Sequence, residues 1–270
     1  MAKGCMKHRL NRMAAISVLV SALFIAAQAV TGPPAVAGAV SKTFRQSIAR
    51  KLGKAQAGTL SKAEAAALRR ELMKLDKDTL DRIARVYGKY IPENSMRAAR
   101  SVSTRFYSHD AYQAHLKKMY PDMTAAQRKD VTGNTEMLTY VDKNQPLLPR
   151  VVAHERLHQL SEFVDTKRKV GMNLHEGMTE FLARRVYGDM SIKGLPIPYP
   201  RKTEVVEVLA ARVGKERIAK AYFRGGKSFQ VLKEDFDEQL GRGAFDAFVE
   251  AMKKERYGDA IKIIKRGVLY

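Results

Sequence analysis

The sequence predicts a mainly helical α+β protein with a small sheet in the first half of the chain. Apolar residues recur at helical spacing over much of the sequence, whereas a β-branched and aromatic run at residues 137–141 predicts a strand. Hydrophobic residues make up 45% of the chain and charged residues 29%, which is a typical balance for a globular protein with a buried core. Both observations argue against a wholly disordered chain.

Residues 1–29 have the parts of a secretory signal peptide. Four basic residues precede an apolar stretch at 13–30, and A-x-A patterns follow at 27–29 and 35–37. The apolar stretch is 18 residues long, which also reaches the lower limit of a membrane span, so an uncleaved N-terminal membrane anchor is the alternative. In both cases we expect the body of the protein to be exported, as a secreted or periplasmic protein.

The chain is strongly basic, with 49 Lys and Arg against 28 acidic residues and a formal net charge of +21. Such a charge favours anionic partners, for example an envelope surface. The basic residues are scattered and form no nucleic-acid-binding motif, so we expect no specific nucleic-acid partner. Contact with a membrane is expected only if the N-terminal segment stays uncleaved. The single cysteine, Cys5, lies inside the predicted signal, so a cleaved chain would have no thiol to bind a metal.

Residues 30–100 are predicted to form a basic helical N-terminal region. Within it, residues 60–90 are predicted to contain two helices, the first beginning at a capping box of Ser61 and Glu64 and the second capped by Asp78. We expect this pair to pack on the main domain as a helical hairpin. The alternative is a pro-segment that inhibits the site.

Residues 101–190 are predicted to form the core that carries the functional site. The expected elements are a helix from about Asp110, a turn at 131–134, a strand at 137–141 and helices at 149–163 and 176–187. Residues 191–270 are predicted to form a helical C-terminal region after a proline-rich connection. Four amphipathic helices are expected there, with breaks at Gly214, Gly225, Gly226, Gly241, Gly243 and Gly258.

The sequence H-E-x-x-H runs from His154 to His158 on the predicted helix 149–163. Histidines at positions i and i+4 lie on one helical face, so both imidazoles can reach one metal ion. Glu155 is rotated away from His154 and is placed to act as a general base on a metal-activated water. A catalytic zinc needs a third protein ligand, and Glu176 lies in the run L-H-E-G-M-T-E on the next predicted helix.

These two motifs resemble those of the gluzincins, the zinc peptidases that include thermolysin and the zinc aminopeptidases. In thermolysin-like enzymes the second helix carries N-E-x-x-S-D; here Glu176 matches the zinc ligand, Thr179 the Ser, and Glu180 the acid that orients the first histidine. His175 replaces the usual Asn, and the resemblance covers only about residues 151–180. It implies a zincin-like fold, a Zn²⁺ cofactor and an edge strand that pairs with substrate, for which residues 137–141 are the candidate.

The donor that stabilises the oxyanion is not fixed by these motifs. His175, Tyr199, His109 and His115 are candidates, although a structural role is the better prediction for each. His175 could also compete with Glu176 as the third ligand.

The sequence thus predicts a zinc-dependent endopeptidase that hydrolyses peptide or protein substrates outside the cytoplasm, with Glu155 as the general base. Two alternatives stay open. One is an exported basic binding protein whose zinc site is inert or structural. The other is a zinc amidase that acts on cell-wall links.

Overall fold

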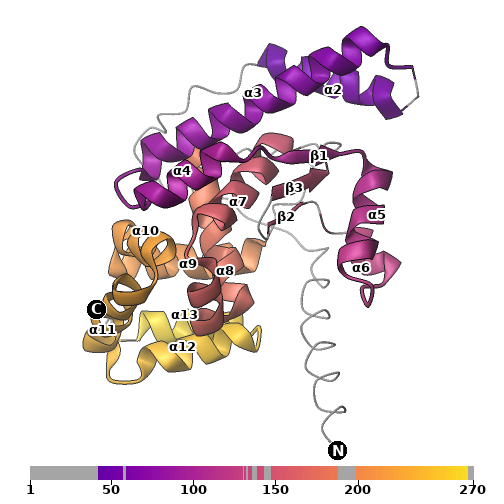
Figure 1. The fold of residues 1–270 in the computed structure, drawn as a ribbon. Helices are drawn as coiled ribbons and strands as arrows, with labels where there is room; N and C mark the ends of the chain where they lie inside the picture. The colour runs from indigo at the N-terminus through magenta and orange to yellow at the C-terminus, as the bar shows by residue number, and fades with distance from the viewer. Residues whose placement is uncertain are drawn as a thin grey trace, which may run out of the picture.

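The computed structural model describes residues 42–56, 59–129, 131, 133–135, 139–142, 147–187 and 199–266. Over these residues the protein is mainly helical with one three-stranded sheet, which confirms the α+β prediction at this coarse level (Figure 1). The predicted signal segment, residues 1–29, lies outside the described residues. The described helices include none that is both long and apolar enough to span a bilayer.

Two helices, α2 (Lys42–Gln56) and α3 (Lys62–Tyr87), pack against one another at one side of the molecule (Figure 1). The predicted capping box is present, because Ser61 accepts from the Glu64 amide and Glu64 accepts from the Ser61 amide. The prediction of two helices between residues 60 and 90 is wrong. Asp78 is an exposed residue inside one continuous helix, which contains no Gly or Pro that would end it.

The sheet consists of β1 (Arg105–Tyr107), β2 (Gly133–Thr135) and β3 (Thr139–Asp142). Strand β3 is central; it pairs parallel with β1 and antiparallel with β2. Two sequence predictions are therefore wrong. The segment expected to be a turn, residues 131–134, contributes to strand β2. The strand expected at the edge, β3, is paired on both sides, so the edge strand that lies beside the helix starting at Leu148 is β2.

Helix α4 (Glu93–Ser101) precedes β1, whereas α5 (His109–Met119) and α6 (Ala125–Lys129) lie between β1 and β2 in the chain. The His115 ring of α5 packs on Tyr140 at 4.2 Å and on Tyr107 at 5.4 Å between ring centroids. The opposite face of the sheet carries Val141, which is fully buried with residues of α2, α3 and α7. The sheet thus has covered side chains on both faces.

The two long central helices are α7 (Leu148–Leu160) and α8 (Phe163–Tyr187), which pack against each other. Pro149 lies in the first turn of α7, where its missing amide hydrogen costs no helical hydrogen bond. The helix predicted to begin at residue 176 begins earlier in the structure. Its chain direction changes at Gly171, whose φ of 77° falls in the region that glycine adopts readily.

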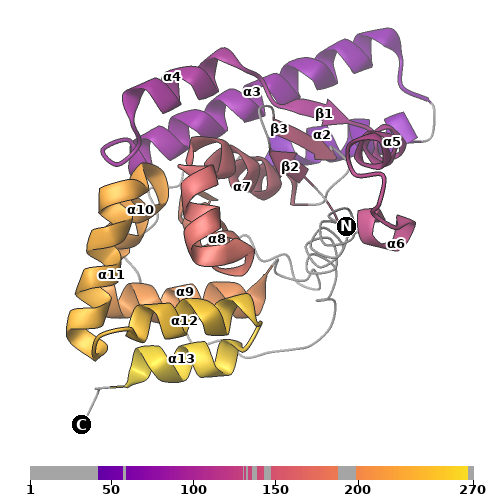
Figure 2. The same ribbon diagram turned by 60° about the horizontal axis from the view of Figure 1, so that its bottom comes forward.

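Residues 199–266, the described part of the C-terminal region, contain five helices, one more than expected. They are α9 (Pro200–Val213), α10 (Lys215–Arg224), α11 (Gly226–Leu240), α12 (Ala244–Lys253) and α13 (Tyr257–Lys265). Gly258 lies inside α13 and marks no break. Figure 2 shows α9, α12 and α13 as a layer on one side of α8, with α3 and α4 on the far side of α7.

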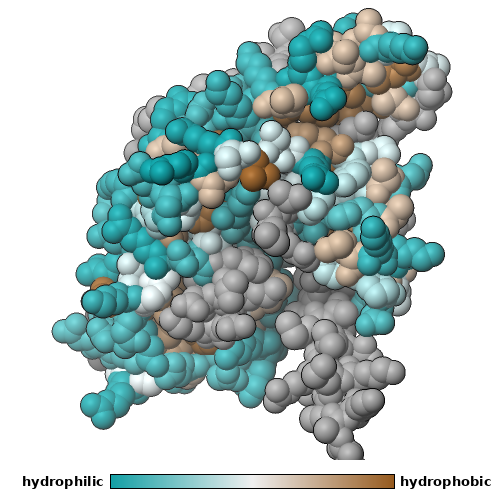
Figure 3. Space-filling view, viewed as in Figure 1, coloured by the Kyte–Doolittle hydropathy of each residue, from teal (hydrophilic) through white to brown (hydrophobic). Residues whose placement is uncertain are grey.

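Helix α7 contributes to both hydrophobic cores of the molecule. Its Val152 belongs to the smaller core with Leu72 of α3, whereas Ala153 and Leu157 belong to the larger core that extends to Ile264 of α13. The surface seen in Figure 3 is largely hydrophilic, with more apolar surface gathered around α2 and the start of α3. A helix buried on so many sides holds its polar side chains in defined positions.

Candidate metal centre

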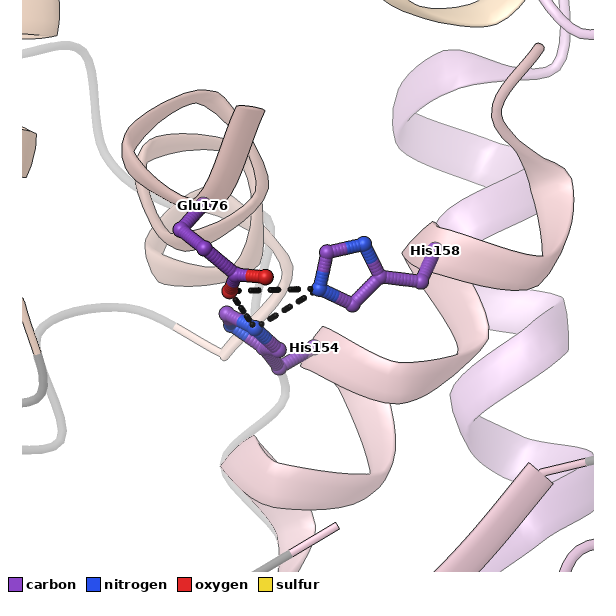
Figure 4. Close-up of side chains that lie close together, drawn as sticks. All are labelled: His154, His158 and Glu176. Carbon is purple, nitrogen blue, oxygen red and sulfur yellow. Dashed lines mark hydrogen bonds and ion pairs between the residues drawn. The ribbon is translucent and has the colours of Figure 1, made fainter. Parts of the chain in front are cut away.

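Three side chains on α7 and α8 bring one ligand atom each to a common point (Figure 4). Glu176 Oε2 lies 3.1 Å from His154 Nε2 and 3.3 Å from His158 Nε2, and the two Nε2 atoms are 3.1 Å apart. His154 and His158 are buried and Glu176 is nearly so. The cluster could hold a metal ion.

Local helix geometry explains this convergence. The i and i+4 spacing on α7 stacks the two imidazoles on one face, with their rings 4.7 Å apart in an edge-to-face arrangement. Helix α8 runs beside α7 and presents Glu176 to that face. The next residue, Gly177, permits a close approach of α9, because a Cβ there would lie 2.7 Å from the Lys202 carbonyl oxygen.

The three atoms fit a tetrahedral metal site. Zinc with ligand distances near 2.0–2.1 Å has ligand atoms separated by about 3.3 Å, close to the three separations found. Burial by itself would raise the pKa of Glu176, but the charges and hydrogen bonds of His158 and His154 hold it well below its usual value. The carboxylate is therefore in the ionised form that a metal requires.

The outer nitrogen of His154 is held by a buried carboxylate. Its Nδ1 lies 3.2 Å from Glu180 Oε2, and Glu180 is in turn bound by Arg150 and lies 3.6 Å from Arg184. A carboxylate only accepts hydrogen bonds, so Nδ1 of His154 is the donor. Nε2 of His154 is then the nitrogen that faces the Glu176 carboxylate, at 3.1 Å, and it is the ligand atom that His154 offers to a metal ion.

The outer nitrogen of His158 is held by a second imidazole. His158 Nδ1 lies 2.9 Å from His175 Nε2, and the fully buried His175 ring stacks on Tyr222 with 5.3 Å between centroids. Thr179 lies near the same nitrogen, at 3.4 Å, and is itself paired with the Tyr222 hydroxyl at 2.8 Å. The His175 side chain is thus engaged behind His158, and Glu176 is the third residue of the cluster.

Glu155 follows His154 on α7 and lies against strand β2, close enough to the cluster to interact with the charges of His154, His158 and Glu176. Its side chain is 6% exposed, and the Thr135 hydroxyl lies 2.9 Å from its Oε2. A Cβ on Gly133 would come within 2.7 Å of Glu155 Oε1, so only glycine leaves room for this carboxylate. Burial raises the pKa of Glu155, although the nearby charges of His158 and His154 oppose the effect. A carboxylate with a raised pKa is suited to general-base catalysis.

Gly133 and Thr135 were not recognised in the sequence as parts of the site. The T-G-N signal around them indicated a turn, and only the pairing of β2 with β3 places them beside α7. No motif in the sequence identifies Gly133 or Thr135 as a neighbour of Glu155.

The remaining sequence candidates separate into two groups. The Tyr199 ring stacks on His154, with centroids 5.7 Å apart and planes at 25°, and it is 36% exposed. The negative charge of Glu176 holds the pKa of Tyr199 well above its usual value. By contrast, His115 lies in the aromatic group between α5 and the sheet, and His109 is an exposed residue at the start of α5.

The described fold and site define a mainly helical α+β protein with a buried His₂Glu cluster that could hold one metal ion. No known family model matches the chain, and neither curated proteins nor solved structures include a match to it. The resemblance to the gluzincins therefore depends on the two motif segments within residues 151–180.

Proposed function

We propose that this protein is a zinc-dependent endopeptidase of the gluzincin type that acts outside the cytoplasm. The observation that carries the proposal is the convergence of His154, His158 and Glu176, with Glu155 buried beside them. An H-E-x-x-H helix alone supports metal binding only weakly. A correctly spaced carboxylate from a second helix makes the full set of protein ligands that a catalytic zinc uses.

Zinc is the metal that these donors favour. Two imidazoles and one carboxylate form the protein ligand set of hydrolytic zinc sites, which leaves a further coordination position for water or substrate. When bound, zinc would supply Lewis acidity that activates water and polarises a carbonyl group. The hydrogen bonds of Glu180 and His175 fix the orientation of the two imidazoles before any metal arrives.

The protein's own groups supply the proton transfers. Glu155 accepts a proton at its carboxylate from the attacking water and passes it to the leaving amine. Thr135 holds one oxygen of that carboxylate. Tyr199 keeps its phenol proton because its pKa is raised, and its ring beside His154 makes it the candidate donor to the developing oxyanion.

Export is supported by the sequence of the first 29 residues and is compatible with a basic chain that meets anionic surfaces. Cell fractionation with an antibody, together with N-terminal sequencing of the recovered protein, tests this part. Recovery of the uncleaved chain in the cytoplasm would contradict it.

The catalytic proposal is tested with Glu155→Gln beside the matched control Glu162→Gln, a change at an exposed glutamate just after α7. We expect one zinc per chain in wild type and both variants by metal analysis. Glu155→Gln should lose casein digestion, whereas Glu162→Gln should keep it. Glu176→Ala should lose the metal and, with it, casein digestion.

Each alternative gives a different result. A binding protein with an inert site would show no casein digestion in wild type and no effect of Glu155→Gln on binding to anionic polymers. A cell-wall amidase would release amines from purified wall polymer but leave casein intact. Either outcome overturns the endopeptidase proposal.

A further inference from the structure

A buried lysine lies at the wall of the metal centre. Lys202 is in the first turn of α9 and is only 8% exposed. Its Nζ lies 4.7 Å from the centroid of the Tyr199 ring, and Tyr199 stacks on His154. Within the part of the chain that the structure describes, the ammonium makes no hydrogen bond or ion pair and contacts the Tyr199 ring instead.

The backbone of this lysine is fixed relative to the metal cluster. Its carbonyl oxygen packs against Gly177, the residue after Glu176, so closely that no side chain would fit there. Tyr199, three residues earlier, adopts a left-handed conformation with φ of 51°, which is unusual for a residue with a side chain. The start of α9 is thus held in a strained arrangement that places an aromatic ring beside His154 and a cation over that ring.

A buried ammonium without a carboxylate partner is unfavourable for stability. Burial lowers the pKa of Lys202, and the charges of Glu176 and Glu255 offset this only in part. A methionine or leucine would fill the same space without that cost. A cation that lies near a catalytic cluster and forms no ion pair with the described residues is suited to bind an anionic group of a ligand.

We propose that Lys202 binds a carboxylate of the peptide substrate, so that the enzyme favours peptides carrying a negative charge close to the bond it cleaves. This inference rests on the proposed peptidase function. In a peptide the carboxylate is either the free C-terminus or an Asp or Glu side chain, and a lysine, as a compact charge on a flexible stem, accepts both. The Tyr199 ring contacts both the cation and His154 and would pack against the bound substrate.

The test measures binding without turnover. Zinc-loaded Glu155→Gln protein is titrated calorimetrically with three matched peptides. The first has a free C-terminus, the second is the same peptide with an amidated C-terminus, and the third is the amidated peptide with one neutral residue replaced by glutamate. We expect at least one carboxylate peptide to bind about tenfold or more tightly than the neutral amide. The free C-terminus and the glutamate peptide distinguish the two sources of the carboxylate.

Adding Lys202→Met to this background should remove the preference for a carboxylate and leave binding of the amide unchanged. Lys202→Arg should keep part of the preference, and Lys215→Met, at an exposed lysine that begins α10, should keep all of it. The zinc content of all variants is measured in parallel. If Lys202 only balanced the charge of Glu176, Lys202→Met would change the affinity for zinc and not the preference for a carboxylate peptide.

The inference is overturned if the carboxylate and amide peptides bind equally, or if Lys202→Met weakens all three peptides alike. These outcomes are separate from failure of the proposed function. If wild type digests no casein while the carboxylate preference persists and depends on Lys202, the subsite stands and the peptidase proposal fails.

Discussion

The Thr135 hydroxyl oxygen lies 2.9 Å from Glu155 Oε2 and 3.0 Å from the Glu155 carbonyl oxygen. The two residues are 20 positions apart in the chain and belong to the edge strand β2 and helix α7. Strand β2 therefore orients the Glu155 carboxylate. The Thr135 hydroxyl binds Oε2 of this carboxylate, and Oε1 lies beside Gly133.

Replacing Thr135 by valine removes this hydrogen bond and keeps the shape of the side chain. We expect kcat on a peptide substrate to fall about 10–100-fold, since a hydrogen bond to a charged group contributes about 1.5–3 kcal/mol. Zinc content should be unchanged because Thr135 contacts none of the three ligands in the described contacts. Thr135→Ser, which restores a hydroxyl, should recover most of the activity. Equal activity in Thr135→Val and wild type would show that Glu155 needs no such support.

Gly133→Ala tests the same contact from the other side. The new methyl group would lie 2.7 Å from Glu155 Oε1, so the carboxylate must move. A displacement of about 1 Å at a catalytic group can lower the rate about a hundredfold, and we expect a loss of that order with zinc retained. Gly258→Ala is the matched control, because nothing lies within 4 Å of a Cβ there. Steady-state kinetics with metal analysis separates the effect on the base from an effect on the metal.

The cluster of His154, His158 and Glu176, which could hold a metal ion, could be predicted from sequence because its geometry depends on only two helices. The spacing of His154 and His158 alone places both rings on one face, and Glu180 follows Glu176 by one helical turn. The environment of Glu155 could not be predicted in this way. It depends on the pairing of β2 with β3, and the sequence signal at residues 131–134 indicated a turn. Lys202 was missed for a similar reason, since lysine is normally a surface residue.

The fold was predicted at the level of its helical character and small sheet, and less well in its boundaries. Asp78 looked like a helix cap, but Leu75 and Leu80 continue one buried face past it, and this packing outweighs the capping preference of a single residue. Gly258 was expected to break a helix, yet it sits in the first turn of α13, where glycine is tolerated. The central position of β3 could not be predicted because strand order depends on contacts that are distant in sequence.

Glu180→Gln should weaken metal binding and keep the fold. The change leaves a group of the same size beside His154 but removes the charge that holds the Nδ1 proton and pairs with Arg150. Partners of this kind alter metal affinity about 10–100-fold, so we expect a loss in that range in a competition titration against a zinc chelator. Glu207→Gln is a suitable control, because Glu207 pairs with Arg184 at an exposed site. An unchanged zinc affinity in Glu180→Gln would contradict the orienting role.

Asp76 of α3 ties the N-terminal helices to the metal helix, and its removal should destabilise the whole protein. Its carboxylate binds Arg156, which lies inside the H-E-x-x-H motif, and accepts hydrogen bonds from the Thr104 amide at 2.9 Å and the Thr104 hydroxyl at 2.5 Å. Arg156 is fully buried, so Asp76→Ala leaves a buried charge without its carboxylate.

We expect a loss of about 3–5 kcal/mol in the free energy of unfolding for Asp76→Ala, measured by urea denaturation of the zinc-free protein. Asp81→Ala is the control; Asp81 pairs with Arg100 at an exposed position on the same helix, and surface pairs contribute about 1 kcal/mol or less.

The contacts of Asp76 with Arg156 and Thr104 also bear on whether the N-terminal helices are a removable pro-segment. If α3 is an integral part of the fold, limited proteolysis that cuts between α3 and β1 should unfold the protein, whereas an inhibitory pro-segment would leave after such a cut and increase peptidase activity.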